Sequence, residues 1–275
     1  MHSFIKKNKY ILVALMGPVS AVVLERIYII LGVGFLHDWT NTIPISFLPF
    51  YASGTLRFVL GIAAILILGW MIKQNGFKYV FSVKGAKKAL FASSANFLLL
   101  LWFLSFVILP IFSPSFAGIE QLTTILPPYI FFNMSVGLYE EVVYRGLLLV
   151  TLLYFWGNSA IGRILCMIPA CIIFTIGHPT PDLINFFLYF FFTMSFCAIF
   201  IYSKNLLILI LLHFVHNVVI VIVQDAFIQS VSESANIVME YLRIAIILFI
   251  IPVFAIYLCV KATPIREEIK LRFVE

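Results

Sequence analysis

The chain has 275 residues, of which 63% are hydrophobic and only 11% are charged, and its formal net charge at pH 7 is +6. Long apolar runs recur from end to end, which predicts a helical membrane protein and excludes a soluble globular domain, a coiled coil and a disordered chain. The positive charge is spread over several connections rather than gathered into one patch, so we expect no nucleic-acid partner.

Apolar runs of about 20 residues, the length that crosses a bilayer as a helix, predict eight membrane spans. We therefore expect an all-α, polytopic protein that forms a single membrane domain over residues 1–275, with the lipid bilayer as its surroundings. The predicted spans, in chain order, are 10–36, 50–72, 89–112, 128–153, 161–178, 183–202, 205–224 and 237–260.

The connections between these spans alternate in charge. Lys and Arg occupy the amino terminus, every second connection and the tail, whereas the intervening connections carry Asp and Glu without any Lys or Arg. Because basic connections stay on the cytoplasmic side, both termini are predicted to be cytoplasmic, which an even number of spans requires.

The first two predicted spans contain isolated charges. Glu25 and Arg26 are adjacent in the first span, and we favour a local ion pair for them over the alternative that they mark a lateral opening. Arg57 lies near the outer end of the second span, where its long side chain is expected to reach the membrane surface.

The fourth span is the centre of the predicted site, because Glu140, Glu141 and Arg145 interrupt an otherwise apolar run. We expect its helix to start at Pro127–Pro128, since proline is common in the first turn. Glu141 and Arg145 are spaced i,i+4 and predict an ion pair, whereas Glu140 points about 100° away and has no partner on its own helix. Charged groups at this depth usually face a polar cavity in which they act, so we expect such a cavity around Glu140.

Two later segments supply the partners that Glu140 lacks. His178 ends the fifth span, and His213 and Asn217 share one face of the seventh. Glu140 lies about 18 Å along its helix and His213 about 12 Å along a helix of opposite direction, so both are predicted near mid-membrane. The motifs together place the catalytic core at about residues 125–225. The four cysteines, which show no Cys-x-x-Cys spacing, are expected to be small core residues: Cys166, Cys171, Cys197 and Cys259.

Glu140-Glu141-x-x-x-Arg145, Phe174-x-x-x-His178 and His213-x-x-x-Asn217 resemble the three motifs of the CPBP family. This family comprises CAAX prenyl endopeptidases and bacterial bacteriocin-processing, abortive-infection-like membrane proteins. The resemblance implies an eight-helix intramembrane endopeptidase in the bacterial cytoplasmic membrane. In its site, Glu140 and His178 would activate water, His213 and Asn217 would hold the oxyanion, and Glu141 and Arg145 would order the surrounding residues.

The residue chemistry agrees with that assignment, because peptide hydrolysis needs a base for water, a donor for the leaving amine and hydrogen bonds for the oxyanion. We favour a glutamate mechanism without a cofactor. The alternative is a zinc site formed by Glu140, His178 and His213, since a catalytic zinc needs only three protein ligands.

The expected partner is a peptide or lipidated-protein substrate, with no selection yet among prenylated proteins, bacteriocin leaders and other membrane-anchored peptides. Two other functions remain open. One is a non-proteolytic immunity or interaction protein of the same family. The other is a proton-coupled transporter, because Glu and His within membrane helices also relay protons.

Overall fold

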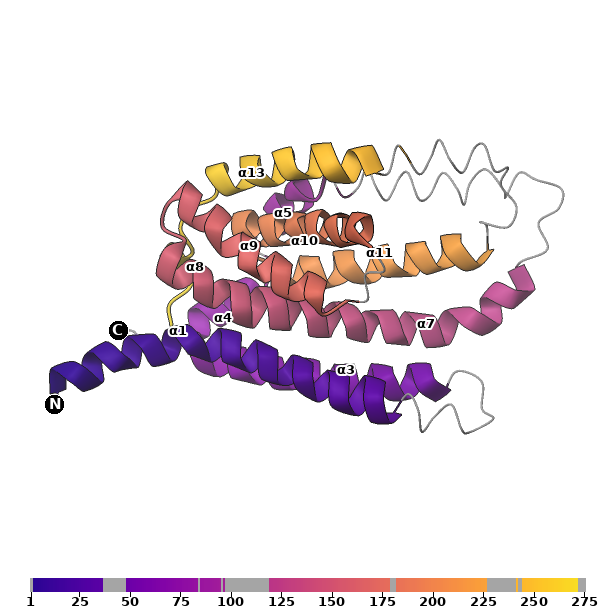
Figure 1. Cartoon of the computed structure of the whole chain (residues 1–275), viewed down its shortest axis with the longest axis horizontal. Helices are drawn as coiled ribbons and strands as arrows, with labels where there is room; N and C mark the ends of the chain where they lie inside the picture. The colour runs from indigo at the N-terminus through magenta and orange to yellow at the C-terminus, as the bar shows by residue number, and fades with distance from the viewer. Residues whose placement is uncertain are drawn as a thin grey trace.

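The structure is a computed structural model that describes residues 2–36, 48–83, 85–94, 96, 119–178, 182–226, 241 and 244–271. The described residues form helices and connections, and their only β pairing is an isolated bridge between Ile72 and Leu271. This confirms the all-helical class for that part of the chain. The helices (Figure 1) are α1 (His2–Ile27), η1 (Tyr28–Leu36), α3 (Leu48–Met71), α4 (Gln74–Val80), α5 (Ala86–Ala92), α7 (Ile119–Glu140), η2 (Glu141–Leu149), α8 (Val150–Trp156), α9 (Ala160–Ile176), α10 (Leu183–Ser203), α11 (Leu206–Ala226), η4 (Ile246–Ile250), α13 (Ile251–Lys261) and η5 (Ile265–Glu267).

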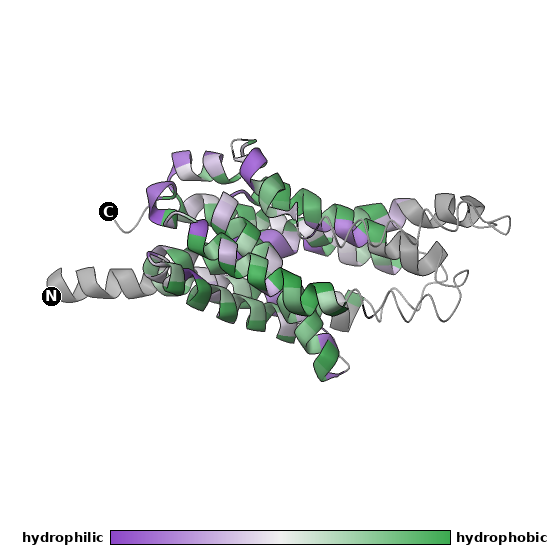
Figure 2. Ribbon diagram, turned by 90° about the horizontal axis from the view of Figure 1, so that it is seen from above, coloured by the Kyte–Doolittle hydropathy of each residue, from purple (hydrophilic) through white to green (hydrophobic). Residues whose placement is uncertain are grey.

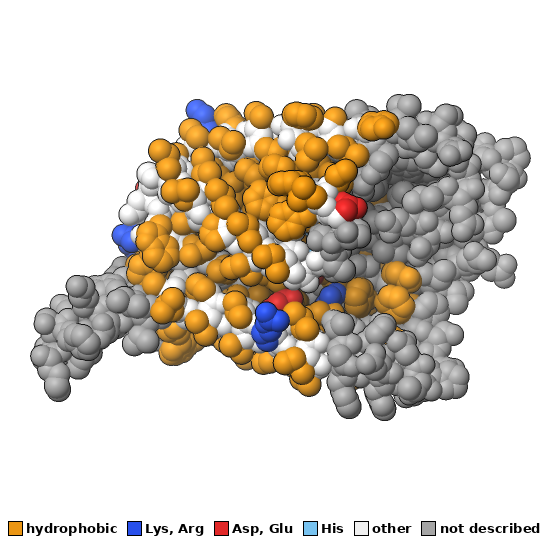
Figure 3. Space-filling view, in the orientation of Figure 1, with side chains coloured by type: hydrophobic (Ala, Val, Ile, Leu, Met, Phe, Trp, Pro, Cys, Tyr) orange, Lys and Arg blue, Asp and Glu red, His pale blue; other side chains and the backbone are white. Residues whose placement is uncertain are grey.

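Three of the described helical segments are long and apolar enough to cross a membrane: Ala14–Gly32, Leu48–Met71 and Leu183–Ser203. Apolar residues dominate the ribbon (Figure 2) and the molecular face in Figure 3, on which charged side chains are few. An apolar exterior of this kind indicates an integral membrane protein. The count of eight spans stays a prediction, because most of the predicted span 89–112 lies outside the described residues.

The start of the fourth predicted span differs from expectation. Its helix, α7, begins at Ile119, and Pro127 and Pro128 lie inside it rather than at its first turn. A proline inside a helix removes one hydrogen bond without preventing the residues before it from being helical. The helical run continues without a break through η2 and α8 to Trp156.

Helices α3 and α11 flank α7 on opposite sides (Figure 1) and approach it closely at glycines. A Cβ on Gly61 of α3 would lie 3.5 Å from the Cα of Tyr139, and one on Gly137 of α7 would lie 3.0 Å from the carbonyl oxygen of Ile210 in α11. Small residues allow helix backbones to pack this closely in membranes. The two contacts fix the segment around Glu140 between α3 and α11.

Candidate active site

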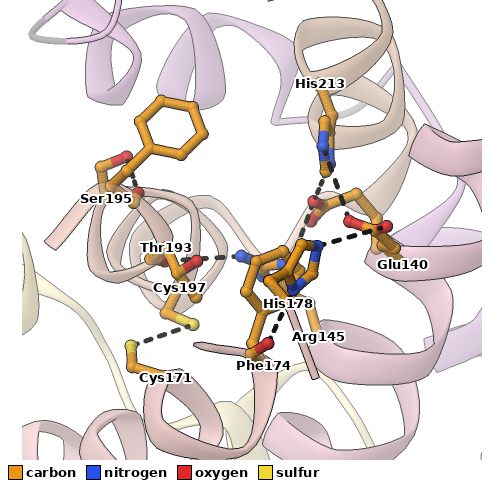
Figure 4. Close-up of polar contacts among 11 residues, drawn as sticks. Glu140, Arg145, Cys171, Phe174, His178, Thr193, Ser195, Cys197 and His213 are labelled. Atoms are coloured by element: carbon orange, nitrogen blue, oxygen red, sulfur yellow. Dashed lines mark hydrogen bonds and ion pairs between the residues drawn. The ribbon is translucent and has the colours of Figure 1, made fainter. Parts of the chain in front are cut away.

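Glu140 is the last residue of α7 and is buried. Two imidazole nitrogens face its carboxylate, one toward each oxygen (Figure 4). The Nε2 of His178 is 3.7 Å from Oε1, and the Nε2 of His213 is 3.8 Å from Oε2. The structure therefore brings together three predicted site residues that are up to 73 positions apart in the sequence.

His178 lies two residues beyond the end of α9 and directly follows its C-cap residue, Gly177. Its Nδ1 lies 2.8 Å from the carbonyl oxygen of Phe174, and its ring stacks on the Phe174 ring with centroids 4.2 Å apart. Because a carbonyl oxygen can only accept, Nδ1 carries the proton and donates it. The other nitrogen, Nε2, is thereby directed at Glu140.

His213 is held in a similar way from α11. Its Nδ1 lies 2.7 Å from Oε1 of Glu141, and it donates to that carboxylate, which leaves Nε2 facing Glu140. The ring of Phe196 packs beside the imidazole with centroids 5.2 Å apart. Both histidines thus use Nδ1 for positioning and present Nε2 to the same carboxylate.

The predicted i,i+4 pair is confirmed, since Arg145 Nη1 lies 3.1 Å from Glu141 Oε1. Both side chains are almost completely buried, at 1% and 0% exposure. Arg145 also donates to the carbonyl oxygen of Thr193 at 3.4 Å and lies over the rings of Phe174 and Phe196. The pair therefore ties η2 to α9 and α10, and the same Glu141 oxygen orients His213.

The pair lies in η2, a π-helical segment that begins immediately after Glu140. A π-helical turn contains one more residue than an α-helical turn, and such turns occur often at functional sites. The π-helical segment therefore begins at the boundary between the two adjacent carboxylates, Glu140 and Glu141.

Asn217 lies one helical turn beyond His213 on α11 and is half-buried. Its side chain forms no hydrogen bond with the residues that the structure describes, so its amide is not joined to Glu140 or His213 there. Its predicted part in holding the oxyanion stays a prediction.

The zinc alternative requires Glu140, His178 and His213 to surround one point. Their nitrogen and oxygen atoms are of the type that zinc binds, and both Nε2 atoms face the carboxylate. Within the described ranges, however, no group of three His, Cys, Asp or Glu side chains has an arrangement that could hold a metal ion. The zinc site remains a prediction that chelation can test.

A second cluster next to Glu140 was missed by the sequence analysis. The Tyr139 hydroxyl donates to Glu25 Oε2 at 3.0 Å, and Arg26 is exposed, without an ion pair to Glu25. Arg57 packs between two rings, with its Cζ 4.3 Å from the Tyr28 centroid and in contact with a second ring on α7. The expectation of a Glu25–Arg26 pair is therefore wrong, whereas the expectation that the partly exposed Arg57 side chain reaches the membrane surface stays a prediction. An arginine inside an apolar span without an acid at i±4 is the signal that could have identified Arg57.

Residues 122–219, which extend from α7 to α11, match a family described as type II CAAX prenyl endopeptidase Rce1-like. This range contains every predicted site residue from Glu140 to Asn217. No curated protein and no solved structure is detectably similar to the chain.

Proposed function

From the match of residues 122–219 to the type II CAAX prenyl endopeptidase Rce1-like family, we propose that the chain is an intramembrane endopeptidase with Glu140 at its catalytic centre. The single observation that carries the proposal is the meeting of one carboxylate with two imidazole nitrogens inside an apolar helix bundle. The proposed substrate is a membrane-associated peptide that is lipidated or carries a leader. The proposed location is a bacterial cytoplasmic membrane, with both termini in the cytoplasm.

The spacing of the three groups suits the activation of one water molecule. Separations of 3.7 and 3.8 Å are longer than a direct hydrogen bond, and a bridging water makes such separations favourable. Glu140 takes one proton from this water, and the water oxygen attacks the peptide carbonyl carbon. This attack places a negative charge on the former carbonyl oxygen, and the charge needs hydrogen-bond donors close by.

The two histidines divide the remaining steps. A protonated His213 donates from both nitrogens, through Nδ1 to Glu141 and through Nε2 toward the oxyanion, to which the Asn217 amide adds a second donor. Glu140, beside His178, returns the proton that it took from water to the leaving nitrogen as the C–N bond breaks. The products are a carboxylic acid and an amine, and the oxygen and two hydrogens of the added water account for both.

Peptide hydrolysis by purified protein in detergent tests the proposal. Glu140→Gln, His178→Ala and His213→Ala are each expected to lower kcat/KM by about 10²- to 10⁴-fold, which is the usual contribution of a positioned acid or base. His216→Phe is a matched control, because His216 lies on α11 and stacks on Phe192 at 4.5 Å. Wild-type hydrolysis by both Glu140→Gln and His213→Ala would contradict the proposed chemistry.

Two further measurements separate the other possibilities. Activity that persists in a strong chelator, in protein without stoichiometric zinc, supports the glutamate mechanism, whereas loss of activity with zinc supports the metal site. If no peptide product forms but Glu140→Gln stops proton-coupled flux in vesicles, the protein is a transporter. Binding of a peptide partner without cleavage of that peptide and without proton-coupled flux would indicate an immunity or interaction protein.

A further inference from the structure

We propose that Arg57 is a substrate-binding residue that receives a carboxylate of the bound peptide, one helical turn from the cleavage centre. This inference rests on the proposed endopeptidase function and adds a specificity determinant to it. Arg57 belongs to α3, outside residues 122–219, so the matched family range does not include it.

The register of α3 against α7 locates the guanidinium. Gly54 of α3 faces Phe132 of α7, and Gly61 faces Tyr139, seven residues further along both helices. The two helices therefore run parallel in step, as Figure 1 also shows. Arg57 precedes Gly61 by four residues, which places its Cα about 6 Å toward the amino end of α7 from the level of Tyr139 and Glu140.

The side chain of Arg57 is partly buried between two aromatic rings. Its Cζ lies 4.3 Å from the centroid of Tyr28 and 4.9 Å from that of Phe132, and its Nε is buried without a hydrogen-bond partner in the described part of the chain. The guanidinium is close enough to Glu140 and His178 for electrostatic interaction with both. No carboxylate of a described residue lies within ion-pair distance of it.

The ring contacts of the Arg57 guanidinium do not fully offset the cost of burying part of it. A guanidinium carries five N–H donors, and contact with two rings offsets only part of the cost of partly removing it from water. Its fixed fork of donors matches a carboxylate in two-point geometry. A bound carboxylate is therefore the ligand that best completes the contacts of Arg57.

Two parts of a peptide can supply this carboxylate: its terminal α-carboxylate or an Asp or Glu side chain. An extended peptide advances about 3.4 Å per residue, so a group one to three residues from the bond that is cleaved reaches Arg57 from Glu140. If the group is the terminal carboxylate, the enzyme cuts close to the end of its substrate. Both sources supply the same ligand, which is a single carboxylate at a short, fixed distance from the peptide bond that is cleaved.

The experiment uses three fluorescent, farnesylated cysteine peptides with three residues after the cysteine. One ends in a free carboxylate, the second ends in an amide, and the third ends in an amide but has Asp in its last position. Binding to the full-length Glu140→Gln variant in detergent is measured by anisotropy, and hydrolysis by wild type is measured in parallel. Arg57→Gln and Arg57→Lys are compared in both backgrounds with Arg26→Gln, which removes an exposed arginine on α1.

The free carboxylate is expected to improve affinity and kcat/KM about ten- to a hundredfold over the amide, and Arg57→Gln is expected to abolish this preference. The Arg57→Lys variant is expected to retain part of the preference for the free carboxylate, and the Arg26→Gln variant is expected to retain all of it. If Asp restores affinity to the amidated peptide, the side-chain source is supported; if it does not, the terminal carboxylate is supported.

Equal preference for the free carboxylate with and without Arg57, or no preference in any variant, overturns the inference. An equal loss of activity toward all three peptides in Arg57→Gln overturns it too, because the arginine would then act on Glu140 or His178. Because binding is measured without cleavage, carboxylate-selective binding in the absence of hydrolysis refutes only the proposed protease function.

Discussion

Glu141 is expected to serve stability and catalysis through one oxygen, and replacing it together with Arg145 separates the two effects. Its Oε1 lies 3.1 Å from Arg145 Nη1 and 2.7 Å from His213 Nδ1. The change Glu141→Leu leaves the Arg145 charge buried at 1% exposure without its counter-ion. Breaking a buried pair in this way costs about 3–5 kcal/mol of unfolding free energy.

The double variant Glu141→Leu/Arg145→Met removes both charges. Buried pairs can often be replaced by apolar residues at little cost, so we expect it to recover most of the lost unfolding free energy. This expectation is strengthened by Glu141 Oε2 and Arg145 Nε, which have no hydrogen-bond partner among the described residues. Catalysis should not recover, because His213 still lacks the acceptor that holds its ring.

The assay combines unfolding free energy in detergent with kcat/KM for peptide hydrolysis. We expect the double variant to unfold within about 1–2 kcal/mol of wild type and to hydrolyse peptide about 10²- to 10⁴-fold more slowly. Glu141→Gln is the control that keeps an acceptor for His213. The reasoning fails if activity returns together with stability in the double variant, because the carboxylate would then act only on the fold.

Three other perturbations test the framework around the site. Gly137→Ala places a methyl group 3.0 Å from a carbonyl oxygen of α11; it should displace the imidazole on that helix and lower kcat/KM about tenfold or more while costing about 1–3 kcal/mol of stability. Gly17→Ala would collide with Thr151, which lies about 16 Å further along the same helical run than Glu140. It should therefore cost at least as much unfolding free energy with normal kcat/KM per folded molecule, and lost kcat/KM without lost stability would contradict this assignment. The exposed Asp182 caps α10 by accepting from the backbone and side chain of Asn185, and these hydrogen bonds hold its pKa below the usual 3.8. The cap is therefore complete above pH 3.8 and is lost as pH falls through the lower folded-state pKa. Protection of the amides in the first turn of α10, measured relative to their intrinsic exchange rates, should fall below that pH in wild type but not in Asp182→Asn. Equal pH dependence of the protection in the two proteins would refute the cap.

The connection between α10 and α11 contains a buried charged residue, Lys204, that has a structural role. Lys204 adopts a left-handed backbone conformation at φ 53° and is buried. Its Nζ contacts Glu268 at 3.0 Å and Thr263 at 2.7 Å, while burial lowers its pKa despite the nearby carboxylate. These contacts join the turn before α11 to the carboxy-terminal segment and so help to fix the helix that carries His213.

Helix class, the Glu141–Arg145 pair and the special position of Glu140 could be predicted from the sequence, because all three depend on local order. Hydrophobic composition requires helices in lipid, and the spacing of four residues puts two side chains on one face whatever surrounds them. A carboxylate in an apolar run without a local partner is likewise visible in the sequence alone.

The meeting of groups that are distant in sequence could not be predicted from any single segment. The approach of His178 and His213 to opposite oxygens of Glu140 depends on how α9 and α11 pack against α7. The contact of Arg57 with Phe132 depends on the register set by glycines in α3. Spacing along one helix determines the direction of a side chain from that helix, but its neighbours are set by close packing between helices, which no single segment encodes.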